Sequence, residues 1–163
     1  MEPIPEELVE ETWQEVAGFA LDRGHTEMTR VSKHQSALAA FIMEFTQELD
    51  QEVRELATYM TFVVHQMFQK GSRKKIKKIS AEEIIDCYEA NEDLMESLEG
   101  VHEKFLDRIA RVQLSGQPYV MRYVVETLIE APEEEDPVAL SDKDIGLLFL
   151  LLKTVVDVLD KTT

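Results

Sequence analysis

Residues 141–159 read SDKDIGLLFLLLKTVVDVL, and this stretch decides the fold class. The run Ser141-Asp142-Lys143-Asp144 opens a helix. Between Ile145 and Leu159 apolar side chains then occupy nearly every face of that helix. A helix that is apolar all round has to be surrounded, either at the centre of a bundle or by a second subunit. The stretch therefore predicts a helical bundle.

The segment before it has the same character. Residues 119–130 are apolar on nearly every face, and Pro132 ends this second helix because proline cannot continue one. Together with residues 145–159 it forms an apolar C-terminal helix pair.

The middle of the chain predicts a long helical hairpin. Apolar residues recur at steps of three and four from Leu38 to Met67, and Ser32 and Gln35 have the spacing of a capping box, which predicts one helix over about 33–69. A second capping box, Ser80 to Glu83, opens a helix over about 81–112. Each would be roughly 50 Å long. Two such helices joined by a short connection form an antiparallel pair, with the basic loop Lys70–Lys78 at its tip.

The N-terminal residues supply one more amphipathic helix. Over residues 6–22 the apolar stripe includes Val9 and Trp13, while Pro5 suits the helix start and Gly24 the helix stop. No alternating strand pattern occurs anywhere in the sequence. We therefore expect a single all-α domain over residues 1–163, built as a bundle of about five helices.

Composition limits the possible partners. The 33 acidic and 17 basic side chains give a net charge of −16, which repels nucleic acid and anionic membranes. The acidic opening is unlike a secretory signal, and no apolar run is long enough to span a bilayer. We expect a cytoplasmic protein with basic partners or none, no contact with nucleic acid or membrane, and a reduced Cys87. The isolated glycines form no phosphate-binding loop.

One pair of residues suggests metal chemistry. Glu99 and His102 are three residues apart on the helix predicted for 81–112, so both side chains point the same way and could hold a divalent metal. A paired metal site needs a second Glu-x-x-His, which the sequence lacks. Glu48 or Glu52 could complete a mononuclear site. The commoner alternative is a hydrogen-bonded histidine at the edge of the core.

The remaining polar clusters favour structural interpretations. Helix 81–112 has a face of carboxylates that could bind magnesium only inside a pocket, and a solvated face is the commoner outcome. Its members are Asp86, Glu89, Asp93, Glu96, Glu103 and Asp107. The six cations of Lys70–Lys78 could bind a phosphate, but we expect a solubilising loop tied to acidic residues elsewhere, such as those of residues 6–22. We also expect these residues to pack in the core: Cys87, Asn91, Met43, Met60, Met67 and Met95.

These observations favour a non-enzymatic function. We expect a protein-interaction or regulatory module that needs no cofactor and works through a helix surface. The alternative is a metal-dependent hydrolase or metal-binding bundle that uses carboxylates and His102. A homodimer is expected because the projecting stripe of Met60, Val63 and Met67 would need a cover, and a two-fold partner commonly supplies one.

Overall fold

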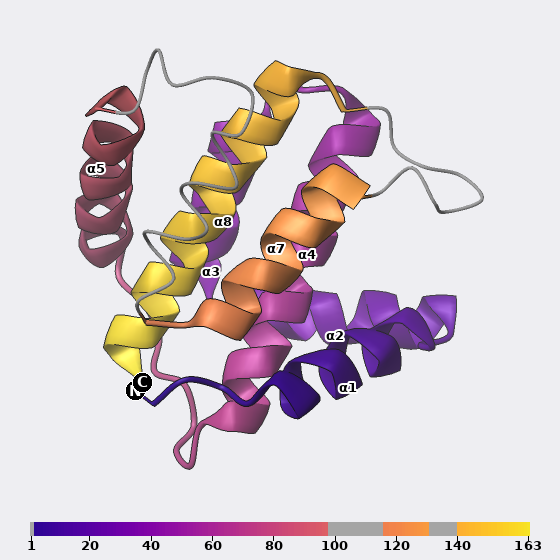
Figure 1. Cartoon of the computed structure of the whole chain (residues 1–163). Coiled ribbons are helices and arrows are strands. Elements are labelled where there is room, and N and C mark those ends of the chain that lie inside the picture. Colours follow the sequence, from indigo (N-terminus) through magenta and orange to yellow (C-terminus); the bar gives the residue numbers. More distant parts are fainter. Residues whose placement is uncertain (1, 98–115, 131–139) are drawn as a thin grey trace.

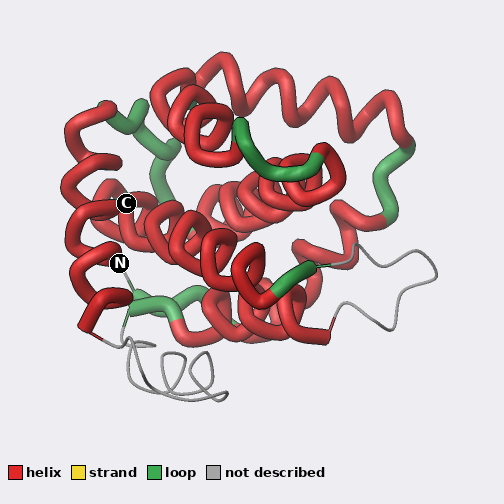
Figure 2. Tube along the Cα trace, turned by 90° about the horizontal axis from the view of Figure 1, so that it is seen from above, coloured by secondary structure: helices red, strands yellow, loops and turns green. Residues whose placement is uncertain are grey.

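The computed structural model describes residues 2–97, 116–130 and 140–163, and every regular element within these ranges is an α-helix, which confirms the all-α prediction (Figures 1 and 2). The helices are α1 (Glu6–Ala17), α2 (Leu21–His34), α3 (Ser36–Thr46), α4 (Gln51–Gly71), α5 (Ala81–Ser97), α7 (Pro118–Glu130) and α8 (Asp142–Thr162). In these ranges no helix combines the length and the apolar character that crossing a membrane requires.

Helix α8 lies at the centre of the bundle, in contact with α3, α4, α5 and α7 (Figure 1). It begins with a capping box, in which the Ser141 Oγ accepts from the Asp144 N–H at 3.1 Å and the Ser141 N–H donates to the Asp144 carboxylate. Every residue from Leu148 to Leu159 except Asp157 is buried. The helix that is apolar all round is thus enclosed by its own chain.

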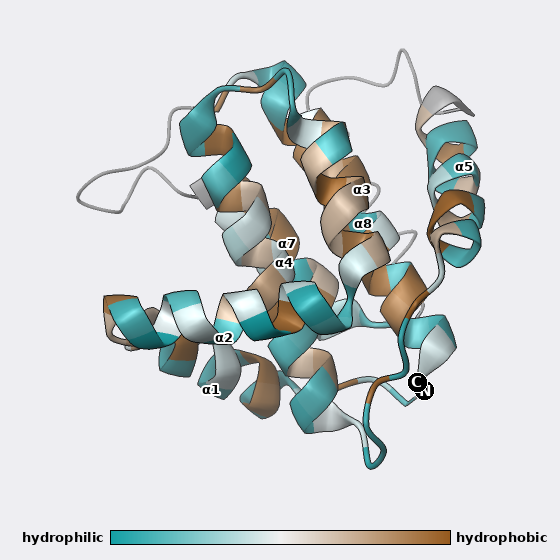
Figure 3. Ribbon diagram, turned by 180° about the vertical axis from the view of Figure 1, so that it is seen from behind, coloured by the Kyte–Doolittle hydropathy of each residue, from teal (hydrophilic) through white to brown (hydrophobic). Residues whose placement is uncertain are grey.

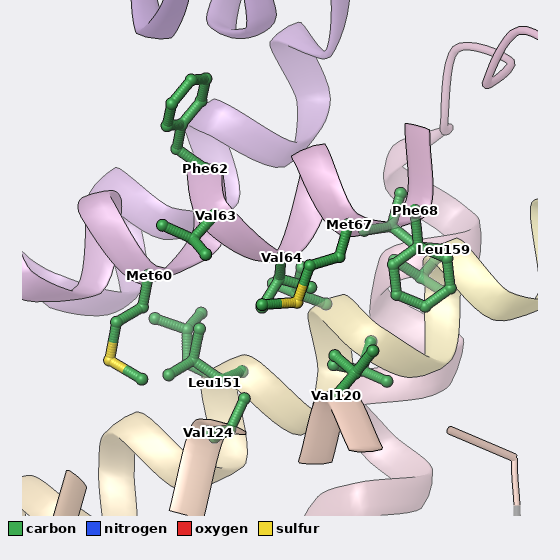
Figure 4. Close-up of a cluster of buried hydrophobic side chains, with 14 of the residues drawn as sticks. Met60, Phe62, Val63, Val64, Met67, Phe68, Val120, Val124, Leu151 and Leu159 are labelled. Atoms are coloured by element: carbon green, nitrogen blue, oxygen red, sulfur yellow. The ribbon is translucent and has the colours of Figure 1, made fainter. Parts of the chain in front are cut away.

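Helix α4 packs its apolar stripe against α7 and α8. Met60, Val63 and Met67 have no exposed surface, and Figure 4 shows Met60 and Met67 on the side of α4 that faces Leu151 of α8 and Val124 of α7. The expectation that this stripe needs a second subunit as its cover is therefore wrong. The cover comes from the two C-terminal helices, which the sequence alone did not place.

The single helix expected over residues 33–69 is also wrong. The chain instead forms the end of α2, then α3 and α4, separated by a turn over residues 47–50 that contains neither Gly nor Pro. A straight helix of roughly 50 Å would carry half of its apolar stripe away from the core. Because the chain bends at this turn, α3 and α4 both contact α8 and each buries its own stripe.

Gln35 explains the break between α2 and α3. The capping box expected at Ser32 and Gln35 is wrong, since Ser32 lies inside α2. The buried Gln35 side chain instead donates from Nε2 to the Lys77 carbonyl at 2.8 Å and accepts at Oε1 from the Ile79 N–H at 2.9 Å. A contact between distant segments of the chain therefore fixes this junction.

Helix α5 begins as expected, with reciprocal hydrogen bonds between Ser80 and Glu83. It is described as far as Ser97, and the rest of the helix expected over 81–112 lies outside the described residues. Its main contacts are with α8 and α3, not with α4 as the hairpin requires, so the expected pairing is wrong over this length. Cys87 and Asn91 are buried, as predicted.

The first two helices project from one side of the bundle (Figure 1). Helix α1 ends at Ala17, where the Gly18 N–H donates to the Gln14 carbonyl at 3.1 Å, and Gly24 lies inside α2 instead of stopping the first helix. Helix α1 packs on α4 and α7. Helix α2 has no buried residue, and Figure 3 shows mostly hydrophilic residues along it, in contrast to α3.

Candidate functional site

The predicted metal pair, Glu99 and His102, lies outside the described residues. Glu48 and Glu52, the expected additional ligands, are exposed. Within 2–97, 116–130 and 140–163 no three His, Cys, Asp or Glu side chains gather closely enough to hold a metal ion.

The acidic face of α5 is partly described. Asp86, Glu89 and Asp93 are exposed, so the expected solvated face is confirmed for these three. The side chains of Glu96, Glu103 and Asp107 lie outside the described part of the chain.

The basic loop is anchored by apolar side chains and by one ion pair. Ile76 and Ile79 are buried, whereas the cations between and around them are exposed. Lys70, at the end of α4, pairs with Glu15 of α1. The expectation that this loop is tied to acid in the first helix is thus confirmed at Lys70.

The methionines expected in the core behave differently from one another. Met60 and Met67 are fully buried, and Met95 packs partly buried against the core. Met43 is 73% exposed, so its placement in the core is wrong. It lines an open hollow of about 640 Å³ between α2, α3 and α4, which no aromatic ring lines.

A different concave surface has the residue types of a binding site. A groove of about 310 Å³ lies between α1 and α7, with Tyr59 of α4 also in its wall. We call it the aromatic groove. It is lined by Glu6, Val9, Glu10, Trp13, Ala17, Tyr59, Tyr119, Arg122, Tyr123, Glu126 and Thr127.

Helical spacing explains why these side chains line one groove. Each of the residues from α1, between Glu6 and Ala17, lies three or four positions from another of them. Those from α7 follow the same spacing from Tyr119 to Thr127. Residues at such steps share one face of a helix. Because α1 and α7 pack against each other and both pack on α4, the two faces form opposite walls of one groove.

The aromatic groove contains four of the five Trp and Tyr residues of the chain. Trp13 is 38% exposed, and the three tyrosines are half-buried. The fifth, Tyr88, lies on α5 against Phe41 and Phe45. Side chains of Trp and Tyr combine a large apolar area with a polar atom and are enriched where proteins bind one another.

The groove also holds three carboxylates and one guanidinium. Arg122 pairs with Glu6, and its Cζ lies 5.3 Å from the centroid of the Tyr119 ring. This distance is within the range of a cation–π interaction. The groove therefore already holds one cation between a carboxylate and an aromatic face.

Sequence reasoning missed this groove. It assigned Trp13 to the core stripe of the first helix, and it treated Tyr119 and Tyr123 as part of an enclosed helix. The available signal was the mixture of acids and aromatic rings at helical spacing, since Glu6, Glu10 and Trp13 fall on one face. Nothing local indicated that this face would lie opposite another one with the same chemistry.

A second polar cluster lies between α5 and α8, where Asn91, Lys153 and Thr154 are buried and Asp157 is partly exposed. The Lys153 Nζ donates to the Asn91 Oδ1 at 2.8 Å and to the Asp157 Oδ2 at 2.7 Å. The Asn91 Nδ2 donates to the Asp157 Oδ2 at 3.0 Å and to the Thr154 hydroxyl at 3.2 Å. These groups satisfy one another and open into none of the hollows described above, which indicates a structural role.

The comparisons give no functional lead. Searches against protein-family models, curated proteins and solved structures found no match for this chain. The function therefore has to be argued from the residues of the chain itself.

Proposed function

We propose that this chain is a non-enzymatic protein-interaction module and that the aromatic groove is where its partner binds. The observation that carries the proposal is the gathering of Trp13, Tyr59, Tyr119 and Tyr123 in one groove. Interface hot spots are enriched in Trp, Tyr and Arg, and here all three residue types line the same surface.

The dimensions of the groove suit a segment of protein. The face of α1 that lines it runs from Glu6 to Ala17, roughly 16 Å along the helix. A groove of this length between two helices can receive an amphipathic helix or an extended peptide. Buried Val9 supplies an apolar surface within it, Glu10, Arg122 and Glu126 along its walls are exposed, and Glu6 is partly buried. An apolar centre with a polar rim is the usual anatomy of an interface.

Site-specific photocrosslinking in the source cells tests this proposal. A photoreactive amino acid replaces Thr127 in the groove wall or, as a control, Glu11, which is exposed on α1 outside the groove. We expect a discrete protein adduct from position 127, its loss when Trp13→Ala is added, and no such adduct from position 11. Equal adducts from both positions, or none from position 127, would contradict the proposal.

The rival hypothesis from the sequence is a metal-dependent hydrolase or metal-binding bundle using Glu99 and His102. It stays a prediction. Metal analysis of the purified full chain separates the two hypotheses, since only the rival expects stoichiometric metal that is lost on His102→Ala.

A further inference from the structure

We infer that the segment bound in the aromatic groove is cationic, with an Arg or Lys side chain of the partner lying over Trp13 beside the carboxylates of Glu10 and Glu126. This inference rests on the proposed function and specifies the chemistry of the partner.

The first argument is the unused negative charge of the groove. Of its three carboxylates, Glu6 is paired with Arg122, whereas Glu10 and Glu126 form no ion pair with any residue that the structure describes. Both side chains are exposed. A partner that brought further acid would meet like charge, and an apolar partner would desolvate both carboxylates without compensation. A cationic side chain of the partner would compensate the charge of both carboxylates.

The second argument is that the chain already shows this mode of binding once. Arg122 lies over Tyr119 and pairs with Glu6 in the same groove. Trp13 offers a larger π face than Tyr119, with Glu10 three residues before it on the same face of α1. A cation of the partner can therefore contact Trp13 and Glu10 in the same way as Arg122 contacts Tyr119 and Glu6.

The third argument concerns the whole molecule. A net charge of −16 attracts cationic partners at long range and raises the rate of encounter. Exposed acidic side chains also lie outside the groove on α1, α4 and α5, so charge alone would not select a place for the partner to dock. The rings of the groove provide that selection, because cation–π contacts act only at close range.

Selection from a random peptide library tests the inference without knowledge of the partner. Random dodecapeptides displayed on phage are selected on the immobilised full chain and counter-selected on the Trp13→Ala variant. The counter-selection removes peptides held by overall charge, because the variant has the same net charge. We expect the recovered peptides to be enriched in Arg and Lys. Recovered peptides without that enrichment, or no peptides that discriminate the variant, would overturn the inference.

The affinity of the best peptide is then measured by fluorescence. Trp13 is the only tryptophan of the chain, so its emission reports on the groove directly. We expect saturable, salt-sensitive binding that weakens about tenfold in Trp13→Ala, measured there by calorimetry. Glu10→Gln should weaken binding by about three- to tenfold. The matched control is Glu11→Gln, which removes the same charge one residue further along α1, outside the groove.

Comparison of Glu10→Gln with Glu11→Gln distinguishes binding in the groove from a general electrostatic attraction to the acidic protein, because both variants have the same net charge. Equal weakening by Glu10→Gln and Glu11→Gln would mean that overall charge binds the peptide, and the inference would be wrong. Thermal unfolding of each variant establishes that it is folded.

The outcomes of the two experiments distinguish failure of the inference from failure of the proposed function. If the photocrosslinked adduct forms but the selected peptides lack Arg and Lys, the interaction module stands and only the cationic partner is wrong. If no adduct forms, the module itself fails.

Discussion

The Lys153 Nζ and the Asp157 Oδ2 lie 2.7 Å apart on successive turns of α8, at the contact with α5. Lys153 is 7% exposed, and its ammonium is held by this carboxylate and by the Asn91 side chain. A buried ammonium is tolerated only when its charge and its donors are matched, so the bundle depends on all three groups.

Asp157→Ala should therefore destabilise the protein more than loss of a surface acid does. The substitution leaves the Lys153 charge buried without a carboxylate, and we expect the free energy of unfolding to fall by about 2–3 kcal/mol. Asp93→Ala, which removes an exposed acid of α5, is the control and should change it by less than about 0.5 kcal/mol. Urea denaturation measures both, and similar losses would contradict the structural role of the cluster.

His65 makes stability depend on pH. Its side chain is 3% exposed, and neither ring nitrogen has a hydrogen-bond partner among the residues that the structure describes. Burial, together with the nearby His34, lowers its pKa from 6.5 to about 4. Between these two values the unfolded chain takes up a proton at this position while the folded chain does not. Folding stability should therefore fall as the pH decreases through this range, by about 3 kcal/mol in total.

The measurement compares wild type with His65→Leu in urea at several pH values. The variant should be more stable by about 1 kcal/mol at pH 7.5, because the unpaired nitrogens are gone, and the difference should grow as the pH falls. His25→Leu, at an exposed position on α2, is the control and should run parallel to wild type. If the free energy of unfolding of His65→Leu also changed with pH in parallel with that of wild type, His65 would not be buried in its neutral form.

Phe149→Asp should abolish folding, because the side chain is fully buried in the most enclosed helix and the aspartate charge would have no partner. Leu150→Asp, at a position 9% exposed, should be nearly as severe. Ile129→Asp makes the same kind of change where the side chain is 42% exposed, and we expect it to cost about 1 kcal/mol or less. Circular dichroism and thermal unfolding compare the three. A folded Phe149→Asp protein would refute the central position of α8.

The basic loop should contribute little to stability. The ion pair between Lys70 and Glu15 has both side chains partly exposed and should contribute about 0–1 kcal/mol, screened by salt. Replacing Lys74 and Lys75 by Gln should have a similarly small effect. A loss of several kcal/mol in the double variant would mean that these lysines are buried or bind a ligand.

The homodimer expected from the sequence stays a prediction, now without the argument from the stripe of α4. Met43 is 73% exposed and lines an open hollow together with Met28 of α2. If a second copy covers this surface, light scattering should report a dimer that Met43→Lys dissociates. A monomer across a wide concentration range would refute the dimer.

The sequence by itself determined the class of structure and several local features of it. The capping box at Ser80 formed as predicted, and the last helix began at Ser141 as expected, because helix starts depend on residues within one turn of the helix. The enclosure of the C-terminal helix followed from its composition, since an apolar surface on all sides has to be covered. The prediction did not specify which elements supply the cover.

Tertiary structure decided the rest. The turn over residues 47–50 carries no Gly or Pro. It forms because a bend at this point lets the apolar stripes of α3 and α4 pack into the same core. The helix is interrupted at Gln35 because the Gln35 side chain forms hydrogen bonds with Lys77 and Ile79, which lie more than forty residues away in the sequence. The aromatic groove has the same origin. Trp13 and Tyr123 each lie on a helix face whose periodicity is typical of core residues, and only the packing of α1 on α7 turned those faces into the walls of a groove. Local periodicity indicates which residues share a face but not what lies opposite it.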